Sequence, residues 1–472
     1  MPFHLSSKLI KLIATNIFLL LITFGYAPQD LIASPRLPNV TPEMERPGFW
    51  IKKIKSPTNP LLTPEKIQKM NEENLKRQDL RLCRIRDLKE DWSREEILSF
   101  LREDWENFGR SEEVRYGKNG TPLGEFFWNK LKNNLGQEFV QETTRMLFAL
   151  IVIRTDIRVF PTDEPSMSAP NQYEFDLFQH SSISPGSPVG IYHFSHDKKW
   201  AYVQTQFIRG WIHIQDLAIA KEKVEIVNYE EAKDRLVVTG NFLTVFGDPS
   251  LRHPAFNAQM GDSFPLLSGP GGAKEPQPFY VIHIPSREDS GSLTIRKGYL
   301  RAGEDVRQGF LPYTQENVAR QAFKMLHHPY GWGDRLGGRD CSRFIMDLFR
   351  TFGILMPRNS KEQAMVGMDP GSLEGKPAQE KQGCLDRSIP LATTLRLPGH
   401  IMLYLGKDRG RHYVIHSIWG IQKSGKAGPA LQKIGRAVVS DLSLGEEGPN
   451  RSLLDRITDI RIIGPSHEIQ EK

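Results

Sequence analysis

The sequence predicts a multidomain α+β protein with three kinds of region. With 472 residues, the chain is long enough for several domains. Apolar residues recur at helical spacing before residue 147, alternate in short runs between about residues 150 and 300, and follow both patterns after residue 312. We therefore expect a mainly helical N-terminal region, a β-rich middle and a C-terminal domain in which helices pack on an antiparallel sheet.

The composition is that of a soluble globular protein, with 39% hydrophobic and 25% charged residues. The net charge of +6 and the isoelectric point near 9.0 suit an anionic polymer such as nucleic acid or a cell wall. However, the basic residues are spread along the chain, without an arginine-rich run or zinc-finger spacing. We therefore expect no nucleic-acid partner.

Residues 1–33 have the pattern of a signal peptide. Lys8 and Lys11 precede an apolar run, and Ala27 and Ala33 are the candidate cleavage positions. An uncleaved anchor is the alternative, because the apolar run is nearly long enough to span a bilayer. In either case we expect an exported protein, periplasmic or extracellular, that meets the membrane only through this segment.

Residues 34–147 are expected to form a linker and a helical domain. The stretch up to about residue 62 is rich in proline. Thr63 and Ser93 each precede an acidic first turn, which is typical of a capped helix start. A charged amphipathic helix is more often scaffold than site, so we assign no chemistry to this region.

Two series of short strands follow, at residues 148–222 and 233–305. Turn residues separate the strands, a pattern that predicts small β-barrels. The first series contains Trp200 and Trp211, and the second is fainter. Both tryptophans are expected to fill a barrel core, although their rims could instead line a groove beside the C-terminal domain.

Residues 312–472 are expected to carry the chemistry. Cys341 begins a helix of apolar residues at three- and four-residue spacing, and Gly353 follows as a stop signal. A thiol in the first turn feels the positive end of the helix dipole, which should lower its pKa and favour the reactive thiolate. The alternative is that Cys341 is a small core residue.

Each arm of a predicted hairpin carries a histidine. His400 begins one strand and His416 lies near the end of the next. One imidazole can act as the base for Cys341 while the second orients the first, as in thiol hydrolases. His412 competes for either role, because strand alternation places it on the same face as His416.

The remaining cysteines, Cys83 and Cys384, either form a disulfide or stay as separate thiols. A metal site is not expected, because no two cysteines are close in sequence and the spaced pair His412 and His416 has no cysteine nearby. The proposed thiol chemistry also needs no organic cofactor.

Five motifs in this domain resemble those of the NlpC/P60 cysteine peptidases. They are Tyr-Gly-Trp-Gly at 330–333, Gly-Arg-Asp-Cys-Ser at 338–342, Met-Pro-Arg-Asn-Ser-x-x-Gln at 356–363, Gly-His-Ile-Met-Leu-Tyr-Leu-Gly at 399–406 and His-Ser at 416–417. The resemblance implies a papain-like core with Cys341, His400 and His416 as the triad. Arg343 stands where the family usually has glycine. This variant occurs in the subgroup of the family that carries bacterial SH3-like domains. The tryptophan motifs of the first barrel also resemble a bacterial SH3 domain.

The resemblance also implies a substrate, the γ-D-glutamyl–diamino acid bond of murein stem peptides. In the subgroup, the positions that match Asp340, Ser342 and Ser360 bind the free amino group of an N-terminal L-alanine. An aromatic residue of the first barrel, here Tyr202, would close that pocket. Alternatively, Asp340 only caps the helix and the serines are turn residues.

Two other functions remain open. The same cysteine and histidine pair could serve an acyltransferase or amidase acting on another amide. The chain could also be a non-catalytic wall-binding protein built from SH3-like barrels.

Overall fold

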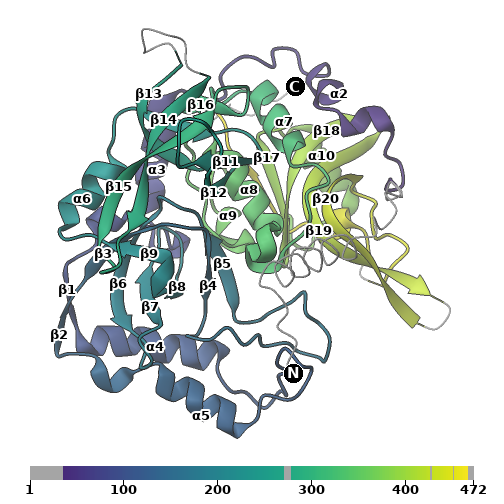
Figure 1. The fold of residues 1–472 in the computed structure, drawn as a ribbon. Coiled ribbons are helices and arrows are strands. Elements are labelled where there is room, and N and C mark those ends of the chain that lie inside the picture. Colours follow the sequence, from purple (N-terminus) through teal and green to yellow (C-terminus); the bar gives the residue numbers. More distant parts are fainter. Residues whose placement is uncertain (1–35, 271–277, 426–427, 450, 466–472) are drawn as a thin grey trace, which may run out of the picture.

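The computed structural model describes residues 36–270, 278–425, 428–449 and 451–465. The expected signal segment, residues 1–33, lies outside this described part. Within it, no helix has both the length and the apolar character needed to cross a membrane. The architecture is α+β and multidomain, as predicted: a helical N-terminal region, two β-barrels and a C-terminal domain of helices on a sheet (Figure 1).

The N-terminal region is helical where capping residues predicted it. Thr63 caps α3 by accepting a hydrogen bond from the Lys66 backbone N–H, and Ser93 forms a reciprocal capping box with Glu96 at the start of α4. The helices and short strands here are α2 (Pro47–Ile51), α3 (Pro64–Leu75), α4 (Arg94–Phe108), α5 (Glu125–Asn134), and β1 (Asp91–Ser93) paired with β2 (Thr143–Arg145).

The first barrel is a seven-stranded sheet in the order β5-β4-β8-β7-β6-β3-β9. Trp200 and Trp211 are buried, but on the outer face of this barrel, in one apolar cluster with α4 and α5. The prediction that they fill the barrel core is therefore wrong, because strand alternation places aliphatic residues such as Val203 and Ile212 in the interior. Its strands are β3 (Leu147–Ile151), β4 (Thr155–Arg158), β5 (Gln179–Ile183), β6 (Pro188–Phe194), β7 (Trp200–Gln204), β8 (Arg209–His213) and β9 (Leu217–Ile219). Helix α6 (Lys223–Glu230) leads to the second barrel.

The second barrel repeats this topology strand for strand. Its order is β12-β11-β15-β14-β13-β10-β16, which is the first order with seven added to each label. Its core is mainly aliphatic, with Leu236, Val245, Ile282 and Leu300 fully or almost fully buried. The strands are β10 (Arg235–Val238), β11 (Phe242–Phe246), β12 (Pro254–Gln259), β13 (Ser263–Ser268), β14 (Phe279–Arg287), β15 (Leu293–Arg301) and β16 (Val306–Gln308).

The C-terminal domain is a five-stranded antiparallel sheet, in the order β20-β19-β18-β17-β21, with helices on both faces. Its strands are β17 (Thr393–Leu397), β18 (His400–Asp408), β19 (Arg411–Gly425), β20 (Gly428–Asp441) and β21 (Asp459–Ile462). Its helices are α7 (Gln315–Lys324), α8 (Cys341–Arg350), α9 (Ser360–Gln363), α10 (Ala378–Asp386) and α11 (Leu453–Arg456).

Helix α8 is the buried centre of the molecule. Its apolar residues Phe344, Ile345, Leu348 and Phe349 are at most 1% exposed, and they share a core with Leu403 and Ile415 of the sheet. In Figure 1, α8 lies between that sheet and the two barrels. Every side chain from Cys341 to Phe349 is buried, so the helix that carries the candidate nucleophile is held on all sides.

Candidate active site

Cys341 is the first residue of α8 and is 8% exposed. Asp340 precedes it as the N-cap, with Oδ1 accepting a hydrogen bond of 2.8 Å from the Arg343 backbone N–H. Asp340 therefore caps the helix, and its binding of a substrate amino group stays a prediction. The backbone N–H groups of Ser342 and Ile401 both interact with the thiol sulfur.

The pairing between strands β18 and β19 ends near Cys341. Strands β18 and β19 pair from Asp408 opposite Arg411 as far as Leu403 opposite Ile415. Ile401 lies beyond the last of these pairs, and on its other side it pairs with Arg396 of β17. Cys341 and Ile401 belong to the same apolar core, and His400 directly precedes Ile401 on β18.

The two predicted imidazoles are linked. His400 Nε2 lies 2.7 Å from His416 Nδ1, and His416 Nε2 lies 3.0 Å from the Ser440 hydroxyl on β20. A neutral imidazole donates through one nitrogen and accepts through the other. When His400 donates to His416, the Nδ1 atom of His400 is left as an acceptor, which is what a general base for Cys341 requires.

Burial favours the neutral forms of these three side chains. It raises the pKa of the Cys341 thiol to about 12, and the Asp340 charge adds to the effect. Burial also lowers the pKa of His400 to about 4 and holds that of His416 well below its usual value. The expected lowering of the Cys341 pKa by the helix dipole is therefore wrong, because desolvation of the thiolate outweighs the dipole.

Asp340 and Ser342 meet as predicted, but Arg358 already binds both. The guanidinium donates to Asp340 Oδ2 at 2.7 Å, to Asp340 Oδ1 at 3.2 Å and to the Ser342 hydroxyl at 2.8 Å. The Arg358 charge holds the Asp340 pKa below its usual range against the opposing effect of burial. Ser360 begins α9 on the same turn, without a hydrogen bond to Asp340 or Ser342 among the described residues.

Tyr202 does not reach this site. Its side chain is fully buried in the first barrel, where its hydroxyl donates to Asp104 and accepts a hydrogen bond of 2.8 Å from Arg209 Nε. Its assignment as the residue that closes the pocket is therefore corrected: alternation along β7 directs Tyr202, with Trp211, to the outer face of the barrel that α4 covers.

A different aromatic residue of the first barrel contacts the C-terminal domain. Phe175, on the loop between β4 and β5, packs with its ring centroid 5.4 Å from those of both Trp332 and Trp419. Trp419 also packs on Tyr330, whose pKa is raised by burial and then by the charges of Cys341 and Asp340. Sequence reasoning missed Phe175, because a long loop without periodicity gives no signal of where its aromatic residues point.

A second polar cluster, here called the ion network, fixes α8 against both barrels. Its charged members are Asp334, Arg339, Arg343, Asp347 and Arg358, all at most 3% exposed. Asp347 accepts hydrogen bonds from Arg339 Nε at 2.7 Å and Arg343 Nε at 2.6 Å. Asp334 lies within 3.2 Å of both Arg343 and Arg358.

Each barrel contributes neutral partners to the ion network. From the first barrel, the Ser182 carbonyl accepts from Arg343 Nη1 at 3.0 Å and the Ser181 hydroxyl accepts from Arg358 Nε at 2.6 Å. From the second barrel, Asn241 Oδ1 accepts from Arg339 Nη1 at 2.5 Å. The network therefore ties the helix of the nucleophile to both preceding barrels.

The first barrel also touches the Tyr-Gly-Trp-Gly motif. Gly333 has a left-handed backbone, with φ of 56°, and a Cβ atom there would lie 2.6 Å from the Gln179 side chain. The Gly333 carbonyl accepts a hydrogen bond of 3.0 Å from Gln179 Nε2. Glycine is required at this position both for its conformation and for the close approach of β5.

Two other sequence predictions concern residues away from the site. His412 pairs across the hairpin with Lys407 and contacts the Tyr404 hydroxyl at 2.9 Å, so it takes no part in the Cys341 cluster. Cys83 and Cys384 are separate thiols rather than a disulfide. Among the described residues, no group of three His, Cys, Asp or Glu side chains is placed to hold a metal ion.

Comparisons with known proteins agree with this geometry. Residues 327–424 match the NlpC/P60 family, and residues 165–213 match the SH3 domain of SH3b1 type. An NlpC/P60 endopeptidase from Photobacterium damselae subsp. piscicida has a similar solved structure, with a TM-score of 0.71, 19% identity, and coverage of 88% of this chain and 96% of that one. At this identity the likeness establishes the fold.

A second solved structure is a weaker match. It is an NlpC/P60 family protein from Bacillus cereus ATCC 10987, with a TM-score of 0.46, 16% identity, and coverage of 67% of this chain and 100% of that one. A search among curated proteins returned no match.

Proposed function

We propose that this chain, an NlpC/P60 cysteine endopeptidase with an SH3b-type domain, is a peptidoglycan hydrolase that cuts the γ-D-glutamyl–diamino acid bond of murein stem peptides. The observation that carries the proposal is Cys341 at a buried helix start, next to the hydrogen-bonded series His400, His416 and Ser440. The bond and the substrate come from the family resemblance of the five motifs.

The geometry supports a general-base mechanism. His400 Nδ1 takes the Cys341 proton as the sulfur attacks the amide carbonyl, and the resulting imidazolium donates through Nε2 to His416. Because burial lowers the pKa of His400, the imidazolium is a strong acid and readily protonates the leaving amine. Backbone N–H groups at the start of α8 stabilise the oxyanion, and water then releases the acyl group from the sulfur.

We also propose that the substrate carries a free N-terminal L-alanine. Asp340 supports this part of the proposal, because its carboxylate stays charged near the nucleophile. Arg358 neutralises much of that charge, so an incoming ammonium must share Asp340 with the guanidinium. A charge-assisted contact of this kind contributes about 1.5–3 kcal/mol, or roughly 10- to 150-fold in rate.

The test is mass spectrometry of defined stem peptides after incubation with the enzyme. Cleavage after γ-D-glutamate is the expected result, with the peptide acetylated on its alanine nitrogen cut at least about 10-fold more slowly. Equal rates for the free and acetylated peptides would refute the amino-group pocket alone. Intact peptides after prolonged incubation would refute the peptidase assignment.

Export is a separate proposal that rests on the pattern of residues 1–33. The mature protein should begin after Ala27 or Ala33 and be found in the periplasm or outside the cell. Amino-terminal sequencing of the protein from each cell fraction tests this. A soluble cytoplasmic protein that retains Met1 would contradict it.

A further inference from the structure

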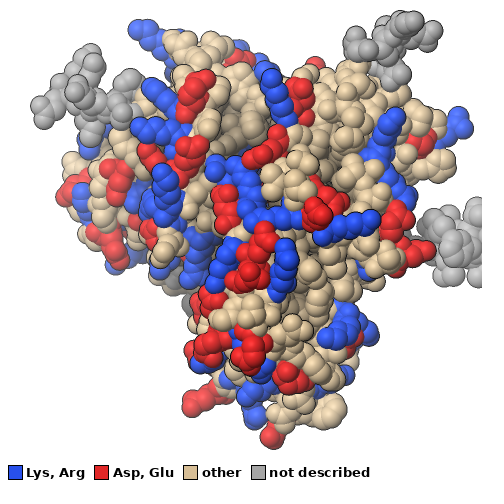
Figure 2. Space-filling view, turned by 90° about the vertical axis from the view of Figure 1, so that its left-hand side faces the viewer, with Lys and Arg blue, Asp and Glu red and all other residues tan. Residues whose placement is uncertain are grey.

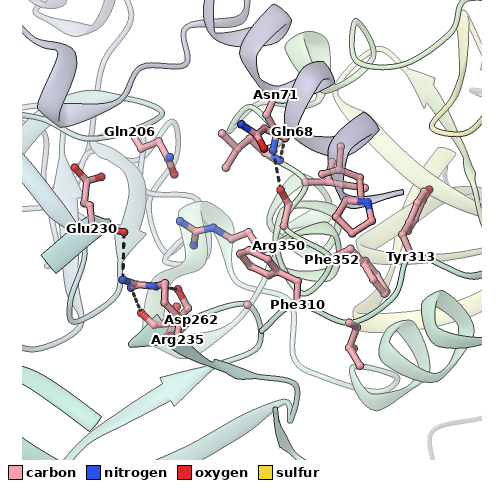
Figure 3. Close-up of a pocket in the computed structure, with 18 of the residues that line it drawn as sticks. Gln68, Asn71, Gln206, Glu230, Arg235, Asp262, Phe310, Tyr313, Arg350 and Phe352 are labelled. Carbon is pink, nitrogen blue, oxygen red and sulfur yellow. Dashed lines mark hydrogen bonds between the residues drawn. The ribbon is translucent and has the colours of Figure 1, made fainter. Parts of the chain in front are cut away.

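A cavity of about 960 Å³ lies where the N-terminal region, both barrels and the C-terminal domain meet. This volume is in the range of small-molecule sites. Residues of all four regions line the cavity, among them Ile67, Phe207, Arg235 and Phe352 (Figure 3). Cys341, His400 and His416 are not among the lining residues, so this cavity is separate from the candidate active site.

Arg350, the last residue of α8, extends into the middle of the cavity (Figure 3). Its guanidinium has no hydrogen bond or ion pair within 4 Å in the described part of the chain, and Asp262 and Asp347 act on it only at longer range. Arg343, two turns earlier on the same helix, is paired with both Asp334 and Asp347. Arg350 is half-buried, and a cation that loses part of its hydration without gaining a partner is costly, so a bound anion would remove that cost.

The charge of the cavity wall also favours an anion. Five arginines line it against two carboxylates: Arg84, Arg86, Arg235, Arg307 and Arg350, against Glu230 and Asp262. The side chains of Arg84 and Arg307, like that of Arg350, form no hydrogen bond or ion pair with any described residue. Burial raises the pKa of Glu230 to about 7, which further reduces the negative charge of the wall near neutral pH.

Most of the remaining wall is apolar. Aromatic rings come from Phe207 of the first barrel and from Phe310, Tyr313 and Phe352 of the C-terminal domain, and Ile67 and Leu62 come from the N-terminal region. Figure 3 shows Phe310 and Phe352 on the same side of the cavity as the Arg350 stem. The cavity therefore combines an arginine without a partner with a surface that accepts a hydrocarbon group.

We propose that this cavity binds a small amphipathic carboxylate, with the carboxylate on the Arg350 guanidinium and the hydrocarbon portion against Phe310 and Phe352. A planar guanidinium suits this role because it can bind a carboxylate through two parallel N–H donors. Arg350 lies at the opposite end of α8 from Cys341, roughly 14 Å along the helix axis. The ligand would thus hold four regions together without entering the active site.

The test is titration calorimetry on the full-length protein with three probes. Octanoate carries both features, octanamide keeps the chain without the charge, and inorganic phosphate carries charge without a chain. Octanoate should bind, with octanamide and phosphate each at least about 10-fold weaker. Arg350→Gln should weaken octanoate by about 10- to 150-fold, whereas Arg252→Gln, at an exposed loop away from the cavity, should leave it unchanged.

Three results would overturn the proposal. Octanamide that binds as tightly as octanoate would show that the cavity recognises only an apolar chain. Phosphate that binds equally well would show an adventitious ion only. Octanoate affinity that survives Arg350→Gln in folded protein would place the carboxylate elsewhere. If Arg350→Gln does not fold, Arg350→Lys is the variant to use, because it keeps the charge. The ratio of octanoate affinity to octanamide affinity then still tests whether the cavity recognises the carboxylate. Each readout is binding, so the result does not depend on the peptidase proposal.

Discussion

Two polar clusters meet at helix α8, and they avoid the cost of burying charge in opposite ways. In the candidate catalytic trio of Cys341, His400 and His416, burial favours the neutral forms, because it raises the thiol pKa and lowers both imidazole pKa values. The ion network keeps its charges, and Asp334 and Asp347 each lie against two arginines. The comparison teaches that the Cys341 thiol can be removed with little effect on stability, because it is small and neutral, whereas a charged side chain of the network cannot.

Cys341→Ala tests the catalytic side of this comparison and has the largest expected effect. Peptide hydrolysis should fall by roughly 10⁴-fold or more, because the nucleophile is lost. The free energy of unfolding should change little, because a small neutral side chain replaces another. Rates on a stem peptide and a denaturant titration measure the two quantities. Cys384→Ala, on α10, is the control that should keep full activity.

Asp347→Ala tests the structural side. It leaves Arg339 and Arg343 buried without their shared acceptor, so the free energy of unfolding should fall by about 3–5 kcal/mol. Chemical denaturation gives this value. The control is Asp305→Ala, which removes a surface pair with Lys324 and should cost at most about 1 kcal/mol. Equal losses in the two variants would contradict the comparison.

The pH dependence of stability gives a third test. The His400 pKa is about 4 in the folded protein and about 6.5 when unfolded, so between these values only the unfolded chain takes up the proton. The free energy of unfolding should therefore fall as the pH falls from about 6.5 to 4, by at most about 3 kcal/mol for this partly exposed histidine. Denaturation of the parent and of His400→Gln at several pH values isolates the contribution. If the unfolding free energies of the two proteins changed with pH in parallel, folding would not lower the pKa of His400.

Ser440→Ala should have a smaller effect on catalysis. The hydroxyl orients His416, which in turn orients His400, so hydrolysis should slow by about 10-fold while the substrate KM stays unchanged. Steady-state kinetics across pH would show the loss. Ser443→Ala, on the loop after β20 and away from the imidazoles, is the matched control. An unchanged kcat in Ser440→Ala would show that Ser440 does not help to orient His416.

Tyr202→Phe should have the smallest effect on hydrolysis. Because the hydroxyl is buried against Asp104 and Arg209, its loss should cost about 1–3 kcal/mol of stability and leave KM for the stem peptide unchanged. A selective rise in KM with unchanged stability would restore Tyr202 to the substrate pocket. Phe175→Ala serves as the contrasting variant, since that ring lies on Trp332 and Trp419.

The parts that the sequence predicted well are local. The α8 helix, its Asp340 cap and the histidine hairpin each follow from periodicity and turn residues within about 20 positions. The first barrel was clear because its buried tryptophans stand out in short strands. The second barrel has the same strand order, but its strands contain no tryptophan, so the same topology gave a fainter pattern.

The parts that sequence reasoning missed depend on contacts between distant segments. Arg358 neutralises Asp340 across 18 positions, and Asn241 meets Arg339 across 98. A single sequence gives the residue types but not the pairings. Ser440 was missed for the same reason, because only the register of β19 with β20 places it beside His416. The Cys341 pKa was misjudged because desolvation depends on neighbours that local sequence does not specify.

The attachment of α8 to both barrels has a consequence for the order in which the chain becomes active. Domains generally fold from the N-terminus as synthesis proceeds, and the strands of both barrels, which end at Gln308, precede residue 341 in the chain. Arg339 and Arg343 then meet partners that are already in place, whereas His400, His416 and Ser440 arrive 59, 75 and 99 positions after Cys341. The thiol therefore stays without its base until nearly the whole polypeptide exists, and unfinished chains carry no competent hydrolase.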